Sequence, residues 1–358
     1  THNVSSAASD VYKRQVWFIS KLGTTSLAAV ALAFPVIMLT QQMAFGALGG
    51  AVTSSIARSL GAEDKERAEK LLWHSLLLSC CGSLIFFLIF FIGGESLLRA
   101  LGGEDSLLEE SLLYIKIFLT GAIFIWLSGT LSAALRGIGN MRFPALLMIV
   151  GSGIQVILAG GLILGWFGLP KLGIIGAPLS AISVAALMAI VMILKFMDSS
   201  SNVQLKLSNL SFKKELFRDI FNVALPASLA PIFTVGTILI LTGLVGQFGV
   251  SALAGYGIGS RIEFLMIPLV FGIGTAMTTM VGTNIGAKKV ERAERIGWLG
   301  GSFAGLFSGM IGLMLILSSS YWINFFATDQ ATYEVTKQYI EIVGLCFTFQ
   351  GLGLSLYF

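Results

Sequence analysis

One stretch of this chain, residues 71–94, limits the possible folds more than any other feature, because its 24 residues carry no formal charge. At 1.5 Å per residue, a helix of this length extends about 36 Å, enough to cross the roughly 30 Å hydrocarbon core of a bilayer. A barrel strand is shorter and alternates apolar with polar residues, and this stretch does not alternate. Backbone polar groups inside lipid must bond within their own segment, so the stretch is predicted to be a transmembrane α-helix.

The whole composition agrees with a chain of such helices. Hydrophobic residues make up 55% of the sequence and charged residues only 12%, whereas soluble proteins carry about 25% charged residues. Nine apolar runs are long enough to span a membrane: residues 25–58, 71–94, 111–134, 144–166, 173–196, 220–245, 251–284, 297–320 and 335–358. The sequence therefore excludes a soluble enzyme and predicts an all-α polytopic membrane protein.

Two of these runs, 25–58 and 251–284, are longer than a bilayer requires. Each exceeds 30 residues, which corresponds to about 50 Å of helix. Proline removes a backbone donor and kinks a helix, and each run contains one, at Pro35 and Pro268. We expect both helices to extend past the membrane or to bend near these prolines.

Lysine and arginine residues gather in alternate loops, and this asymmetry predicts the orientation of the chain. One set of loops holds 15 of them and the other holds 4, which are Lys21, Arg99, Lys171 and Lys337. Short loops rich in positive charge stay on the cytoplasmic side. The loops near residues 61, 139, 205 and 289 are therefore expected in the cytoplasm, with the acidic connection 95–110 outside, in a multi-pass protein of the cell inner (plasma) membrane.

The chain repeats itself at a spacing of 225 residues. The string L-G-A-E-D-K-E-R-A-E-K at 60–70 returns as I-G-A-K-K-V-E-R-A-E-R at 285–295, and Tyr114-Ile115 returns as Tyr339-Ile340. Six spans separate the copies, so both copies cross the membrane in the same sense, as in transporters built from parallel repeats. The pattern predicts two six-helix lobes related by an axis along the membrane normal, of which helices two to ten are present.

The predicted organisation has four parts. Residues 1–15 are expected to be a non-native or disordered flank, and residues 16–200 an N-terminal lobe lacking most of its first helix. Residues 201–219 are expected to be a cytoplasmic linker between the lobes. Residues 220–358 would be a C-terminal lobe lacking its last two helices, so the chain is interpreted as truncated at both ends.

Ionisable groups are scarce inside the predicted spans, and a charge near mid-membrane costs about 2.5–3.5 kcal/mol on insertion scales. Arg261 and Glu263 are the deepest, with Glu263 about 18 Å from the outer end of its span. Residues two apart on a helix point in different directions, so these two are not expected to pair. Glu263 is interpreted either as a carboxylate that binds a cation in a central cleft or as part of a fixed structural ion pair.

Other polar or aromatic residues in the spans have weaker assignments. Lys116 and Glu341 occupy equivalent repeat positions and are expected to be interfacial or to form an outer gate. Gln41 and Gln42 lie midway along the first span, where an amide can bond to a neighbouring helix or a ligand. Trp126 is a candidate wall for cationic substrates, although packing is the commoner use of such a residue.

Enzyme and metal chemistry find little support in the sequence. The three cysteines lie in apolar runs and have no metal-ligand spacing, and His74 is expected to be an interfacial histidine at the start of a span. We predict no metal site, no cofactor and no catalytic residue. A net charge of +4, spread over the loops, also gives no nucleic-acid footprint.

Five motifs occur in a characteristic order: L-G-T-T-S-L-A-A at 22–29, the repeated G-A-x-x-x-E-R-A loop, L-R-G-I-G-N-M-R-F-P at 135–144, L-G-I-I-G-A-P-L-S at 172–180 and L-P-A-S at 225–228. Together they resemble one transporter family, the multidrug and toxic compound extrusion (MATE) proteins. The resemblance implies twelve helices in two lobes and the export of organic, often cationic compounds in exchange for H⁺ or Na⁺. It implies a monomer whose partners are small molecules, the coupling cation and the bilayer.

The sequence departs from the family pattern at positions that bear on coupling. Some branches of the family carry acids in the seventh and tenth helices, at the positions that are Thr234 and Gln350 here, and the usual polar positions of the fifth helix hold Gln155 and Ala159. The coupling ion therefore stays open between H⁺ and Na⁺. An alternative function is a lipid-linked oligosaccharide flippase of the same wider superfamily, which would favour a strongly basic cavity.

Overall fold

The computed structural model describes residues 17–199, 201–264, 266–324 and 329–357. The predicted flank 1–15 lies outside the described residues. The described residues form helices and connecting loops without a strand, so the all-α prediction is confirmed. Within this part of the chain, eight helices are long and apolar enough to cross a membrane, and a bent pair makes a ninth candidate. This number agrees with the nine spans predicted from the sequence.

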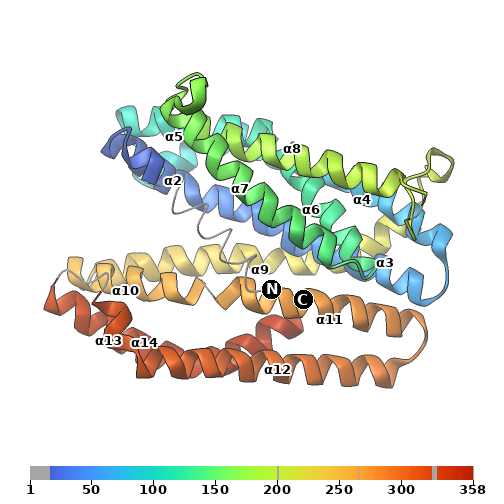
Figure 1. Cartoon of the computed structure of the whole chain (residues 1–358). Helices are drawn as coiled ribbons and strands as arrows, with labels where there is room; N and C mark the ends of the chain where they lie inside the picture. The colour runs from blue at the N-terminus through green and yellow to red at the C-terminus, as the bar shows by residue number, and fades with distance from the viewer. Residues whose placement is uncertain (1–16, 200, 265, 325–328, 358) are drawn as a thin grey trace. The chain divides into compact units, whose positions relative to one another are not determined.

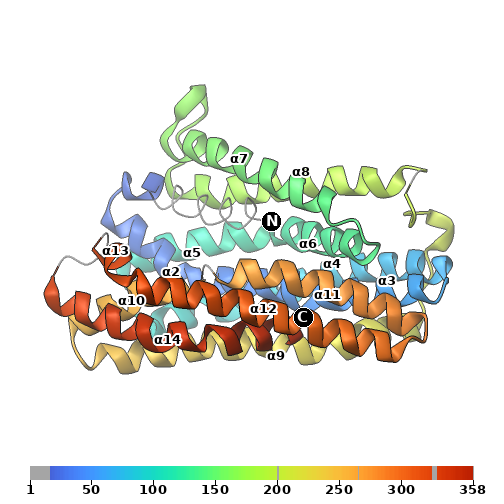
Figure 2. The ribbon, with the colours of Figure 1, turned by 60° about the horizontal axis from the view of Figure 1, so that its bottom comes forward.

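The chain divides into two compact units, residues 2–231 and residues 232–358, and the division falls inside helix α9 (Lys214–Gly246). The predicted linker, residues 201–219, belongs to the first of these units. Helices of the first unit are α2 (Thr24–Gln41), α3 (Gly49–Gly61), α4 (Lys65–Ala100), α5 (Asp105–Thr120), α6 (Ala122–Gly137), α7 (Arg142–Leu164) and α8 (Gly176–Met197). Short 3₁₀ turns at Trp166–Gly168 and Gly173–Ile175 connect α7 to α8, which pack side by side (Figure 1 and Figure 2).

The first predicted span is not a uniform helix. A π-helical segment, η1 (Gln42–Leu48), separates α2 from α3, while Pro35 lies within α2. The departure from α-helical geometry therefore falls after the proline rather than at it. Packing of this region is close, because Phe45 lies against Gly129 and the Thr53 hydroxyl donates to the Ala133 carbonyl at 2.9 Å, both on α6.

The third predicted span, residues 111–134, is bent in the structure. Helices α5 and α6 meet at 48° around Gly121. A Cβ atom at Gly121 would lie 2.5 Å from the Ile182 side chain of α8, so only glycine allows this close approach. Beyond the bend, α6 is buried along most of its length and contacts α3, α4 and α8, which makes it the centre of the first unit.

The second unit contains the remainder of α9 and five further helices: α10 (Val250–Phe264), α11 (Met266–Gly286), α12 (Val290–Leu317), α13 (Ser319–Ile323) and α14 (Gln330–Tyr357). Pro268 lies in the first turn of α11. Helices α12 and α14 pack along a stripe of small residues (Figure 1), where a Cβ at Gly312 would collide with the Gly344 carbonyl oxygen. Small residues allow such backbone approach in membrane helices.

Candidate functional site

Glu263, near the end of α10, is held by two side chains of α14. The Tyr339 hydroxyl donates a hydrogen bond to Oε2 of Glu263 at 2.6 Å, and the Gln350 amide nitrogen donates to Oε1 at 2.6 Å. Tyr339 and Gln350 are eleven residues apart, about three helical turns, so they lie on the same face of α14. The sequence analysis had singled out Glu263 and Gln350, and the structure brings these two together.

Glycines on α10 let this helix approach α14 closely. A Cβ at Gly255 would lie 2.7 Å from the Val335 side chain, and one at Gly259 would overlap the Tyr339 ring. The Thr336 hydroxyl also reaches the Gly255 carbonyl oxygen at 3.4 Å. The glycine spacing in A-G-Y-G-I-G-S therefore determines which face of α10 meets α14, and it positions Glu263 against its two donors.

The two groups that donate hydrogen bonds to Glu263 are polar but uncharged. Both of its oxygens accept from neutral donors, and among the described residues Glu263 takes part in no ion pair. The Tyr256 ring packs edge to face on the Tyr339 ring at a centroid distance of 5.7 Å. Glu263 itself is half-buried. An ionised carboxylate in this setting is hydrogen-bonded but not neutralised, so a cation, or a proton, can compensate its charge.

Arg261 does not neutralise Glu263. Its side chain is exposed, and it forms no ion pair within the part of the chain that the structure describes. This arrangement follows the expectation that residues two apart on one helix face in different directions. The fixed structural ion pair considered for Glu263 has no counterpart among the ion pairs of the described residues.

Sequence reasoning missed Tyr256 and Tyr339 as parts of this cluster. Tyr339 was noticed only because it repeats Tyr114, which is buried in α5. The usable signal was the glycine pattern of α10, since glycines spaced four apart indicate a helix face that meets a neighbouring helix. Tyr339 lies against this glycine face, where its hydroxyl can donate to the Glu263 carboxylate.

The remaining predicted site residues take no part in the two hydrogen bonds to Glu263. In the first unit, Gln41 is exposed at the end of α2, Gln42 begins η1, and Gln155 is half-buried in α7. Trp126 is buried in α6 against Phe86, at a centroid distance of 5.5 Å. Three further members of the predicted set are exposed: Thr234 on α9, Lys116 on α5 and Glu341 on α14. Neither Lys116 nor Glu341 forms an ion pair among the described residues.

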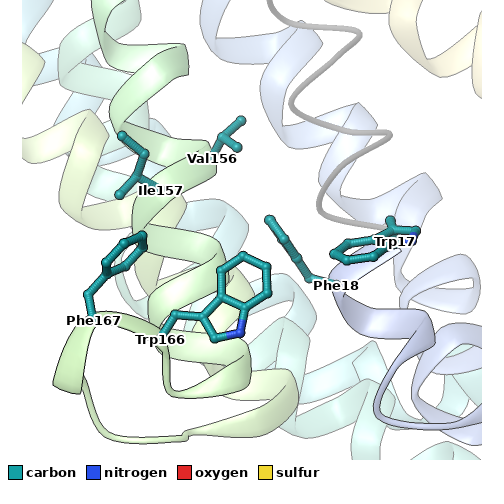
Figure 3. A pocket seen from close by; sticks show the side chains of 6 residues that line it. All are labelled: Trp17, Phe18, Val156, Ile157, Trp166 and Phe167. Carbon is teal, nitrogen blue, oxygen red and sulfur yellow. The ribbon is translucent and has the colours of Figure 1, made fainter.

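An aromatic pocket of about 320 Å³ lies in the first unit, and none of the predicted site residues is among those that line it. Figure 3 shows Phe18 beside Trp166 in the lining, and the two rings are in edge-to-face contact with centroids 5.4 Å apart. The Lys21 ammonium lies 5.2 Å from the Trp17 ring beside the pocket. The lining residues are Trp17, Phe18, Val156, Ile157, Trp166 and Phe167. This lining suits an apolar group and provides no charged ligand for an ion.

Comparison with known proteins places the geometry in context. The MatE family profile matches residues 15–159 and 226–357. The probable multidrug resistance protein YoeA of Bacillus subtilis is 26% identical over 331 residues, covering 90% of this chain and 70% of that protein. The FAD transporter of Shewanella oneidensis is 26% identical over 91% of this chain and 72% of its own length. A solved MOP superfamily transporter from Pyrococcus furiosus, 25% identical, covers 99% of this chain and 79% of that one with a TM-score of 0.88.

Proposed function

The chain belongs to the MatE family of membrane transporters, which its motifs resemble, and we propose that it is a cation-coupled antiporter exporting organic compounds. The exported compounds are drugs or metabolites that are often cationic, and the coupling ion is H⁺ or Na⁺. Relatives named as multidrug resistance proteins support export of drug-like molecules. Transport proceeds by alternating access between two lobes, and the protein acts as a monomer.

The observation that carries the coupling proposal is the hydrogen-bonded carboxylate of Glu263. It accepts from Tyr339 and Gln350, which can hold it in place but cannot cancel its charge. A charged carboxylate in a low-dielectric setting is costly unless a positive partner or a proton compensates it. Glu263 is therefore proposed as the group that exchanges one positive partner for another.

Antiport follows from competition for this one charge. If the coupling ion and a cationic substrate bind the same carboxylate, each weakens the binding of the other by the same factor. Entry of the ion on the outside then releases substrate, and entry of substrate on the inside releases the ion. Gln350 suits this exchange because its amide can donate to an ionised carboxylate or, after rotation, accept from a protonated one.

Replacement of Glu263 by glutamine tests the proposal. Glu263→Gln keeps the size of the side chain and removes its charge, so gradient-driven export should fall about tenfold or more, while the amount of protein in the membrane stays close to normal. Efflux of a fluorescent cation and the protein level are measured in the same cells. Glu334→Gln is the matched control, because Glu334 is exposed at the start of α14, and its export should equal that of the unchanged protein.

Two results would contradict the role of Glu263. Normal export by Glu263→Gln would mean that coupling resides in another group. Loss of the protein from the membrane would indicate that the carboxylate is needed for folding, and Glu263→Asp then decides the matter, since a retained but shortened carboxylate should restore the fold and shift the ion dependence of transport.

A further inference from the structure

The segment that connects α8 to α9, residues 201–213, is bound to the first turns of α4. Glu69 is 4% exposed, and its carboxylate accepts from the Gln204 backbone N–H at 3.2 Å and from the Asn209 amide at 2.5 Å. The Trp73 indole N–H donates to the Lys206 carbonyl at 2.9 Å. The position of the segment is therefore determined by side chains of α4.

His74 holds the carboxyl end of the same segment. Its Nε2 accepts from the Lys213 backbone N–H at 3.0 Å, so its Nδ1 carries the proton and donates to the Lys70 carbonyl at 2.7 Å. The Phe217 ring packs on the imidazole at a centroid distance of 4.5 Å. Asp219 completes the attachment through Arg58 and Arg67, at 2.7 and 3.0 Å.

Held in this way, the segment directs three large apolar side chains outward. The exposed fractions are 77% for Leu207, 47% for Leu210 and 72% for Phe212, and these three residues are here called the apolar ridge. Val203, by contrast, is fully buried at the start of the segment. The bonds to α4 hold the opposite side of the segment inward. Within the described part of the first unit, the apolar ridge is therefore left exposed.

Four exposed cations flank the apolar ridge: Lys206, Lys213, Lys214 and Arg218. Glu215 is the exposed acid among residues 201–219, since Asp219 is paired with Arg58 and Arg67. The four cationic side chains make no hydrogen bond or ion pair within the described residues, and Lys206 and Lys213 contact α4 only through their backbones. The surface therefore combines apolar bulk with unneutralised positive charge.

The contacts with α4 also indicate the depth of this surface. The charge-free run of α4 begins at residue 71. The side chains that bind the segment lie on both sides of this position, at Glu69, Trp73 and His74. The segment therefore lies level with the boundary between lipid and water, on the side that the positive-charge distribution assigns to the cytoplasm. Tryptophan is common at this boundary, and cationic segments there meet the anionic headgroups of the cytoplasmic leaflet.

We propose that residues 206–218 form a binding surface for anionic phospholipids. Leu207, Leu210 and Phe212 enter the boundary between headgroups and acyl chains, and the four cations contact the phosphate groups. This is the pattern of amphipathic segments that lie in the plane of a membrane, where apolar burial and attraction to anionic lipid act together. Each cation contributes about a five-fold preference for an anionic over a neutral surface.

Spin labels on the apolar ridge test this proposal in the full chain. Leu207→Cys and Phe212→Cys are labelled in a protein whose native cysteines are replaced by alanine, and Asn202→Cys, exposed before the ridge, is the reference position. The proteins are placed in vesicles of phosphatidylcholine alone or with about one quarter phosphatidylglycerol. With the anionic lipid, the ridge labels should gain access to oxygen and lose access to a water-soluble nickel chelate, whereas the label at residue 202 should stay open to the chelate.

A charge variant separates lipid attraction from simple burial. Changing Lys206, Lys213, Lys214 and Arg218 to glutamine retains every bond to α4, because those bonds use backbone atoms or other side chains. The phosphatidylglycerol-dependent change should fall at least about tenfold in this variant. The control changes Lys288, Lys289, Arg292 and Arg295, four exposed cations of the second unit, and should keep the response.

Three outcomes would overturn the proposal. The ridge labels could stay equally open to the nickel chelate in both vesicle types, or the charge variant could respond to phosphatidylglycerol as fully as the control. Shielding of the labels in detergent, without any anionic lipid, would show that protein rather than lipid covers the ridge.

Discussion

His74 shows how a single buried side chain can determine the path of a loop. Its ring is 2% exposed, and both nitrogens are engaged, one by the Lys213 N–H and one by the Lys70 carbonyl. The sequence predicts an interfacial histidine at the start of a span, and in the structure His74 lies buried in the third turn of α4. Its partner Lys213 is 139 positions away, and no local pattern could reveal this contact.

Replacement of His74 by phenylalanine should loosen the 201–213 segment. The ring volume is kept but the Lys213 N–H is left without its acceptor, which costs about 1–3 kcal/mol when such a donor is buried. Hydrogen exchange at Lys213 should therefore become about tenfold faster or more, with little change in helices distant from α4. Leu77→Ala, an exposed change on the same helix, is the control and should leave this amide protected. Unchanged exchange in His74→Phe would show that the other contacts suffice.

At the scale of elements, the sequence predicted which segments form helices but not where those helices break. Apolar runs indicate spans because lipid forces helical backbone bonding, and this argument is local. The π-helical segment at Gln42–Leu48 and the bend at Gly121 depend on neighbours, here α6 and α8. A glycine in an apolar run has many uses, so the run alone could not show that Gly121 faces Ile182.

For the candidate site, too, the sequence predicts the local features but not those that depend on a neighbouring helix. The sequence singles out Glu263, because charged residues are rare inside a predicted span. It does not identify the groups that donate hydrogen bonds to Glu263, since Tyr339 and Gln350 belong to a helix that begins at Gln330, 67 residues further along the chain. The missing information is the contact between α10 and α14, which depends on the fit of glycines against side chains in three dimensions.

The small-residue contact between α12 and α14 gives a test at this scale. In Gly312→Val, the new side chain meets the backbone of Gly344, so overpacking should destabilise the second unit by about 1–3 kcal/mol. Gly297→Val, on the same helix but facing open space, should change stability by less than about 1 kcal/mol. Thermal unfolding of both variants in detergent provides the comparison.

The two glycine variants differ only in their surroundings, so equal unfolding temperatures would contradict the packing argument. A further consequence concerns the site, because α14 carries both donors to Glu263. Displacement of α14 by Gly312→Val should therefore reduce export in addition to stability, and Gly297→Val should leave export unchanged.

For the molecule as a whole, the parallel repeat is the feature with the widest consequences. The loop at 60–70 and its copy at 285–295 have the same sequence character, and they fall at corresponding turns, after α3 and after α11. The likeness to the Pyrococcus furiosus transporter extends over 99% of the chain, so the helical arrangement is that of the family. Opposite halves that run in the same sense must place equivalent loops on the same side of the membrane.

Thiol labelling tests this topology directly. Ala62 and Ala287 are equivalent positions of the repeat, both exposed, whereas Ser106 is exposed in the first turn of α5, within the acidic region 95–110. In a protein whose native cysteines are replaced, Ala62→Cys and Ala287→Cys should both be protected from a membrane-impermeant reagent in intact cells and react after permeabilisation. Ser106→Cys should react from outside, because the loops with 15 of the positive charges stay inside. If the repeat were inverted, the cysteines at positions 62 and 287 would give opposite labelling results. If the orientation were reversed, both would react in intact cells and the cysteine at position 106 would be protected. The two contradicting outcomes are therefore distinguishable.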